Sequence, residues 1–133
     1  MNNTANIARV LVRVCGVIQI VLGILFWTNN ALALIPVHML NGMIIVLLLW
    51  LLAALAAFSG VSWRTIALSA VGGFVVIVLG FNQARILPGD LHLVIEVLHL
   101  LVGLAALGMA DALARTIKQA RATKIQSESP SAV

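Results

Sequence analysis

Three ionisable side chains recur at helical spacing within one apolar stretch, Leu91–Gly103 (LHLVIEVLHLLVG). Each residue of a helix advances about 100° around the axis, so His92, Glu96 and His99 share a face that also includes Gly103. Polar groups inside a bilayer are costly unless they have a partner or a task. The stripe therefore indicates either a binding site or a set of polar contacts between helices.

A second histidine–glycine pair precedes this stripe in the sequence. HMLNG (His38–Gly42) and HLLVG (His99–Gly103) both read His-x3-Gly. A glycine four residues after a histidine lies on the same helix face, so each pair combines a nitrogen ligand with bare backbone. A flat macrocycle such as haem b could lie against that surface, with Gly42 and Gly103 beside it.

The elements that must hold these residues follow from the composition. The chain has 133 residues, of which 62% are hydrophobic and 9% are charged, and its mean hydropathy is +1.14. A soluble domain carries about 25% charged residues, and so short a chain cannot bury this much apolar surface. A membrane span needs about 20 apolar residues. Four segments fit, and they run from about 8 to 27, 36 to 58, 65 to 81 and 91 to 113.

These segments predict an all-α fold. Their apolar runs are unbroken, which excludes the alternating pattern of a membrane barrel, and short connections join antiparallel neighbours. We therefore expect an integral membrane four-helix bundle with up-down-up-down topology over residues 1–115. Residues 116–133 are expected to form a cytoplasmic tail that is first basic and then, over Ser127–Val133, disordered.

The basic residues predict the orientation of this bundle. With four spans, all of the lysines and arginines except Arg85 fall on one side. Because cations are retained on the cytoplasmic side, both termini should be cytoplasmic, in the plasma or inner membrane. The basic charge is then a result of topology, and nothing indicates nucleic-acid binding. A signal peptide cleaved at Ala31–Ala33 is an alternative, but cleavage would leave three spans, so we favour a retained first helix.

Depth in the membrane restricts how the histidines can pair. The second and fourth helices run in the same direction, which places His38 and His92 at similar depth near the outer surface. His99 lies about 10 Å deeper than His92 at about 1.5 Å per residue. We therefore expect His38 and His92 to be the axial ligands of a haem, with His99 as the alternative to His92. Arg85, the one basic residue on the outer side, could pair with the acidic groups of the ring; pairing with Asp90, or simple solvation, is an equal alternative.

Histidines on two helices are also the feature in which this bundle resembles small four-helix membrane cytochromes b. The resemblance extends no further than those histidines. The chain also has the size of small multidrug exporters, but its first helix lacks the glutamate that those proteins carry within the membrane.

The main functional hypothesis is electron transfer through one haem b, between quinol and an extracytoplasmic acceptor. The first alternative is a non-enzymatic subunit or scaffold of a larger membrane complex, in which the polar stripe joins helices. A proton- or metal-coupled carrier using Glu96 and His99 is a further alternative, and it would need a homo-oligomer to enclose a pathway. His38, His92 and His99, together with Glu96, could also hold zinc or copper, whereas a di-iron centre lacks the necessary carboxylates.

Other polar residues within the spans are expected to be structural. Gln19 in the first helix should form hydrogen bonds between helices, and Asp111 should pair with Arg115 one helical turn later. Trp27 and Trp63 have the positions of anchors at the two membrane surfaces.

Overall fold

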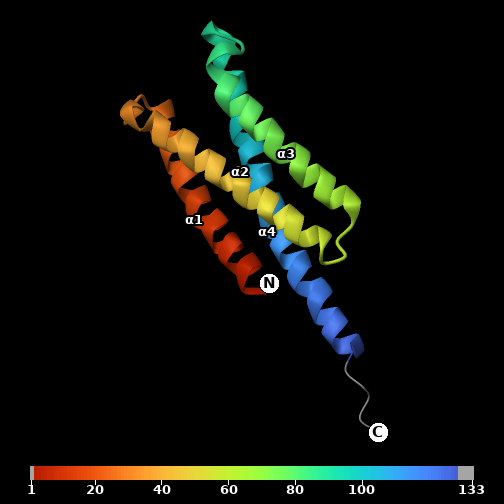
Figure 1. Ribbon diagram of the computed structural model, residues 1–133. Helices are drawn as coiled ribbons and strands as arrows, with labels where there is room; N and C mark the ends of the chain where they lie inside the picture. The colour runs from red at the N-terminus through yellow and green to blue at the C-terminus, as the bar shows by residue number, and fades with distance from the viewer. Residues whose placement is uncertain (1, 129–133) are drawn as a thin grey trace.

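The computed structural model describes residues 2–128, which form four long helices. These are α1 (Asn2–Trp27), α2 (Ile35–Ala57), α3 (Trp63–Asn82) and α4 (His92–Glu128) (Figure 1). Three short 3-10 helices lie in the connections, η1 (Leu32–Leu34), η2 (Gln83–Arg85) and η3 (Gly89–Leu91). Each long helix is apolar enough and long enough to cross a membrane. The predicted all-α four-helix bundle of a multi-pass membrane protein is confirmed.

The two histidine-bearing helices, α2 and α4, form the centre of the bundle. α2 and α4 pack against each other, and α1 and α3 each pack against both of these central helices. Within the described residues, α1 and α3 share no contact. One end of the bundle holds both chain ends and the α2–α3 connection (Figure 1), and we call it the terminal end. The opposite end, with the α1–α2 and α3–α4 connections, is called the two-loop end.

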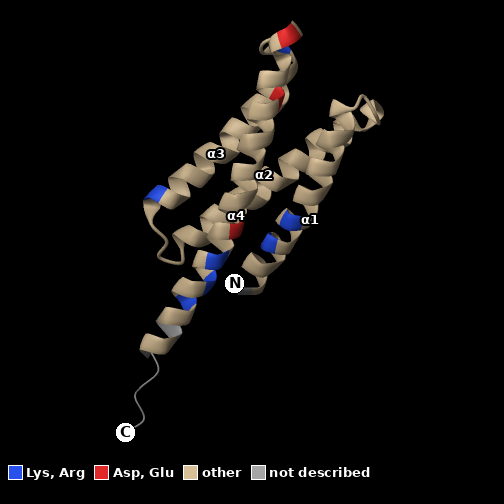
Figure 2. Cartoon of the chain, turned by 180° about the vertical axis from the view of Figure 1, so that it is seen from behind, with Lys and Arg blue, Asp and Glu red and all other residues tan. Residues whose placement is uncertain are grey.

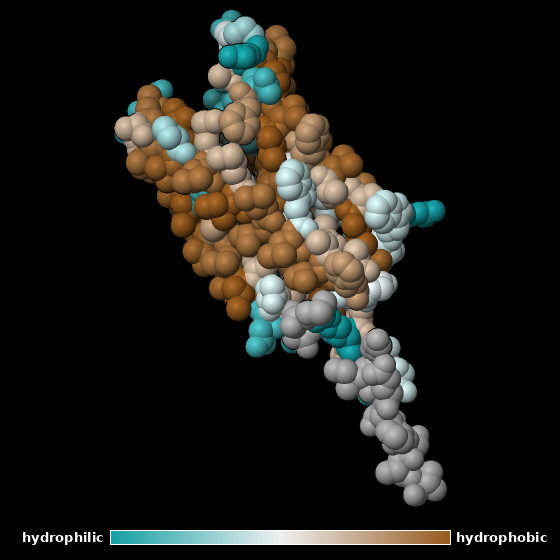
Figure 3. Space-filling view, in the orientation of Figure 1, coloured by the Kyte–Doolittle hydropathy of each residue, from teal (hydrophilic) through white to brown (hydrophobic). Residues whose placement is uncertain are grey.

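The buried core lies toward the terminal end. It joins the first half of α1, the second half of α2 and the middle of α4 through small and branched side chains. Its members are Ala5, Ala8, Val12, Leu49, Leu52, Ala53, Ala56, Ala106, Ala110, Leu113, Ala114 and Ile117. Most other large apolar side chains are exposed, and they give the molecule the continuous apolar surface in Figure 3. Such a surface needs lipid as its solvent.

Local signals explain where two of the helices begin. Pro36 lies in the first turn of α2, where a missing N–H costs no hydrogen bond. The hydroxyl of Ser62 accepts a hydrogen bond from the backbone N–H of Thr65 and caps α3. Ser62 was not expected to have this role from the sequence, although serine is among the common caps.

α4 is longer than the span expected from the sequence. It continues beyond Leu113 to Glu128, so the basic part of the predicted tail is helical. Ala114 and Ile117 are buried in the core, and the following residues are mostly good helix formers. Ser127 belongs to this helix, whereas residues 129–133, most of the segment predicted to be disordered, lie outside the described residues.

Charged residues gather at the terminal end (Figure 2). The predicted pair of Asp111 and Arg115 is present, with 3.0 Å between Oδ2 and Nη1. Arg9 and Arg13 of α1 also contact Asp111, which the spacing along one helix could not reveal. The cytoplasmic location of this end remains a prediction from charge.

Candidate functional site

A cavity of about 130 Å³ lies in the half of the bundle near the two-loop end. α1, α2 and α4 form most of its wall, which is largely apolar. The polar side chains that line it are those of Gln19, His38, Gln83, Glu96 and His99, and the glycines are Gly23, Gly42 and Gly103. Four of the residues predicted from the two His-x3-Gly patterns therefore meet at one place, together with Glu96.

The imidazole rings of His38 and His99 face each other across the central helix pair. Their centroids are 6.5 Å apart and their planes make an angle of 49°. The ring of Phe26 packs edge-on against His38 at a centroid distance of 5.2 Å. Both Nδ1 atoms are buried without a hydrogen-bond partner among the described residues. A buried polar atom without a partner beside a cavity is the expected sign of a missing ligand or water.

His92, the expected axial partner of His38, does not line the cavity. Its Nε2 atom lies 3.8 Å from Oε1 of Glu96, one turn along the same helix. The reason is the offset between the two hairpins: the α3–α4 hairpin extends farther at the two-loop end than the α1–α2 hairpin (Figure 1). α4 therefore begins beyond α2, and His99 rather than His92 comes level with His38.

A glycine on each flanking helix lies beside one of the two rings. A Cβ atom built at Gly23 of α1 would lie 3.8 Å from Cε1 of His38. One built at Gly80 of α3 would lie 3.4 Å from Cε1 of His99. The sequence analysis did not connect either glycine with a histidine, because both lie on other helices.

The two predicted site glycines differ in their surroundings. A Cβ atom at Gly42 would lie 3.1 Å from Nε2 of Gln19, so this position is nearly filled. A Cβ atom at Gly103 would have no neighbour within 4 Å. Gly103 thus faces open space in the cavity, on the side of α4 that carries His99.

Gln19 has the structural role that was expected of it. Its Oε1 atom accepts a hydrogen bond of 2.7 Å from Nδ2 of Asn41, which also donates to the backbone oxygen of Cys15 at 2.8 Å. Asn41 is 8% exposed, and it fastens α2 to α1 beside the cavity. The sequence analysis did not name Asn41, although an asparagine between His38 and Gly42 was a polar residue in need of a partner.

The expected anion partner, Arg85, lies in η2 and is exposed, and it does not line the cavity. Its neighbour in sequence, Gln83, does, and the Oε1 atom of Gln83 is buried without a partner in the described part of the chain. Gln83, and not Arg85, is therefore the residue of η2 that lines the cavity.

No group of three or more histidine, cysteine, aspartate or glutamate side chains is placed to hold a metal ion within residues 2–128. The four residues considered for zinc or copper are divided into two pairs, His38 with His99 and His92 with Glu96.

Comparison with known proteins gives no relative: no protein-family model, no curated protein and no solved structure matches this chain.

Proposed function

We propose that this membrane protein binds one haem b in the cavity, with His38 and His99 as axial ligands. The observation that supports this most directly is the 6.5 Å between the two imidazole centroids. Two metal–nitrogen bonds of about 2 Å each, together with the distance from each nitrogen to its ring centre, account for about 6 Å. Paired histidines from two helices are an established form of haem ligation.

The glycines and the open position at Gly103 suit a flat ligand. A cavity of about 130 Å³ is smaller than most ligand pockets, which enclose about 300–1,000 Å³. A porphyrin would therefore extend beyond it, between the helices and away from the buried core. When bound, the haem iron would accept and donate single electrons.

Glu96 and His92 suit a role beside that electron transfer. Glu96 lines the same cavity as His99 and lies 3.8 Å from His92 in the direction of the two-loop end. A carboxylate and an imidazole at such positions can accept protons and pass them outward. This supports quinol, which releases protons together with electrons, as the donor.

The proposal is tested by the absorption spectrum of the full-length protein, expressed with an ample supply of haem and purified in mild detergent. We expect a Soret band and, on reduction, the sharp bands of a six-coordinate haem. His38→Ala and His99→Ala should each remove the six-coordinate spectrum. His92→Ala is the matched control, with the same residue type on the same helix as His99, and it should retain the spectrum. A colourless wild-type protein would refute the proposal.

A second candidate function is that of a non-enzymatic subunit in a larger membrane complex. An apolar groove between α2 and α3 favours it. The groove is lined by Trp50, Ala53, Ala54, Ala57, Ile66, Ala70, Val71 and Phe74. Small residues on such a surface let another helix approach closely in lipid. Loss of co-purifying membrane proteins on Ala54→Phe, with the haem spectrum unchanged, would support this role.

A further inference from the structure

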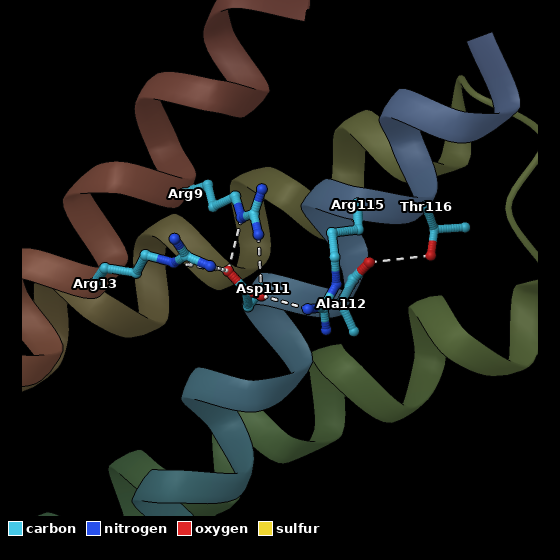
Figure 4. Close-up of polar contacts among 6 residues, drawn as sticks. All are labelled: Arg9, Arg13, Asp111, Ala112, Arg115 and Thr116. Carbon is cyan, nitrogen blue, oxygen red and sulfur yellow. Dashed lines mark hydrogen bonds and ion pairs between the residues drawn. The ribbon is translucent and has the colours of Figure 1, made fainter. Parts of the chain in front are cut away.

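At the terminal end, three arginines surround one carboxylate (Figure 4). Nε of Arg9 lies 2.7 Å and Nη2 of Arg13 lies 2.8 Å from Oδ1 of Asp111. Nη1 of Arg115 lies 3.0 Å from Oδ2. We call these four residues the arginine cluster. Two arginines come from α1 and one from α4, so the cluster joins these helices.

The arginine cluster carries more positive than negative charge. Three guanidinium groups meet one carboxylate, which leaves a formal charge of +2. Of the other acidic residues, Asp90 and Glu96 lie near the two-loop end and Glu128 lies at the end of α4. An excess of positive charge at a membrane surface attracts anionic groups from the surroundings.

The exposure of the side chains shows where that anion would bind. The side chain of Asp111 is 17% exposed, whereas those of Arg13 and Arg115 are 59% and 57% exposed. Asp111 thus fixes one edge of each guanidinium, and the remaining N–H groups of Arg13 and Arg115 are directed outward. Val10, Val14 and Val17, which flank Arg13 on α1, are also exposed. The outward face therefore borders lipid chains.

The depth of the cluster matches that of the lipid phosphates. Asp111 lies nineteen residues after His92, the first residue of α4, which is about 29 Å at about 1.5 Å per residue. The hydrocarbon layer is about 30 Å thick. If α4 begins at one surface, the arginine cluster lies at the other, where phosphate groups begin.

From these observations we infer that the arginine cluster is a binding site for the phosphate of an anionic phospholipid. Arg13 and Arg115 contact the phosphate, and Arg9 with Asp111 holds the two helices at the required separation. Guanidinium groups bind phosphate oxygens through paired hydrogen bonds. A lipid with a net negative charge is preferred because the cluster has an excess of two positive charges.

Native mass spectrometry of the full-length protein in detergent tests this inference. Phosphatidylglycerol and phosphatidylcholine are titrated in parallel, and the dissociation constant of each is measured. We expect tighter binding of phosphatidylglycerol. The double substitution of Arg13→Gln with Arg115→Gln should weaken that binding about thirtyfold, since each cation contributes about fivefold. Arg9 still pairs with Asp111 in this variant, which keeps α1 and α4 joined.

The matched control combines Arg64→Gln with Arg85→Gln, which removes two exposed positive charges outside the cluster. We expect it to change the affinity by less than about twofold, because distant charges act only weakly through solvent. Equal losses in the two double variants would overturn the inference, and so would equal binding of the two lipids. Inorganic phosphate is added in a separate arm. Displacement of phosphatidylglycerol at equimolar phosphate would show a site for soluble phosphate and contradict the assignment to lipid.

Discussion

At the scale of single residues, two histidines on one face of α4 have different surroundings. His99 lines the cavity, and its ring lies near that of His38. His92 does not line the cavity, and its ring lies near the carboxylate of Glu96. Their separation of seven residues makes them equivalent in a helical projection. Only the position of α2 distinguishes the two histidines. The proximity of the His99 ring to the His38 ring on α2 is therefore the reason to propose His99, and not His92, as an axial ligand of the haem.

The open space at Gly103 allows the cavity to be filled without disturbing the fold. Gly103→Leu would extend a side chain into the cavity, where its Cβ atom has no neighbour within 4 Å. We expect haem content to fall at least tenfold. The free energy of unfolding should stay the same or rise by up to about 1 kcal/mol, because leucine favours a helix over glycine. Haem content is measured from the absorbance ratio of haem to protein.

Gly108→Leu is the control for this change. Gly108 lies on the same helix, also has open space at its Cβ position, and does not line the cavity. Its haem content should equal that of the wild type. Equal haem content in the Gly103→Leu and Gly108→Leu variants would place the haem elsewhere.

At the scale of helices, the approach of α3 to α2 depends on Gly73. The Nε1 atom of Trp50 donates a hydrogen bond of 3.2 Å to the backbone oxygen of Ala70. A Cβ atom at Gly73 would lie 2.6 Å from the same nitrogen and 3.1 Å from Cγ1 of Val46. The indole ring can approach α3 this closely only because position 73 has no side chain.

Gly73→Ala should therefore destabilise the bundle. An added methyl group in a packed interface costs about 1–3 kcal/mol, and the better helix propensity of alanine offsets up to about 1 kcal/mol of it. We expect the free energy of unfolding in mixed micelles to fall by the difference, up to about 2 kcal/mol. Gly108→Ala, where the Cβ position is open, should instead gain up to about 1 kcal/mol. Equal stability of the two variants would mean that the ring of Trp50 moves aside. The close approach of Trp50 to Gly73 would then not determine how α2 packs against α3.

The four long helices of this protein were predictable from the sequence. Their positions relative to one another along the bundle axis were not. Apolar length set the four spans, and helical periodicity grouped Glu96 and His99 on one face. The choice between His92 and His99 depended on how far each hairpin extends, which is set by packing between helices distant in sequence. The partners of Asn41 and Arg9 were also not predictable from the sequence, because each lies on another helix. Asn41 bonds to Gln19 on α1, and Arg9 pairs with Asp111 on α4.

At the scale of the whole molecule, the distribution of charge predicts one orientation in the membrane. Green fluorescent protein fused to either terminus should fluoresce, and alkaline phosphatase fused to either terminus should be inactive, because both termini are expected in the cytoplasm. Alkaline phosphatase inserted after Asn30, in the α1–α2 connection, should be active. An active phosphatase at the C-terminus would reverse the orientation. A mature N-terminus near residue 34 would show that the first helix is cleaved.

The core lies toward the terminal end and contains no histidine, which has a consequence for the order of biogenesis. The helices are fastened at the terminal end by buried alanine, leucine and isoleucine side chains, and this contact surface forms without any contribution from the histidines. The chain can therefore complete membrane insertion and folding first and receive the proposed haem afterwards. Newly made protein should accumulate as a stable precursor when the ligand is scarce, instead of being degraded.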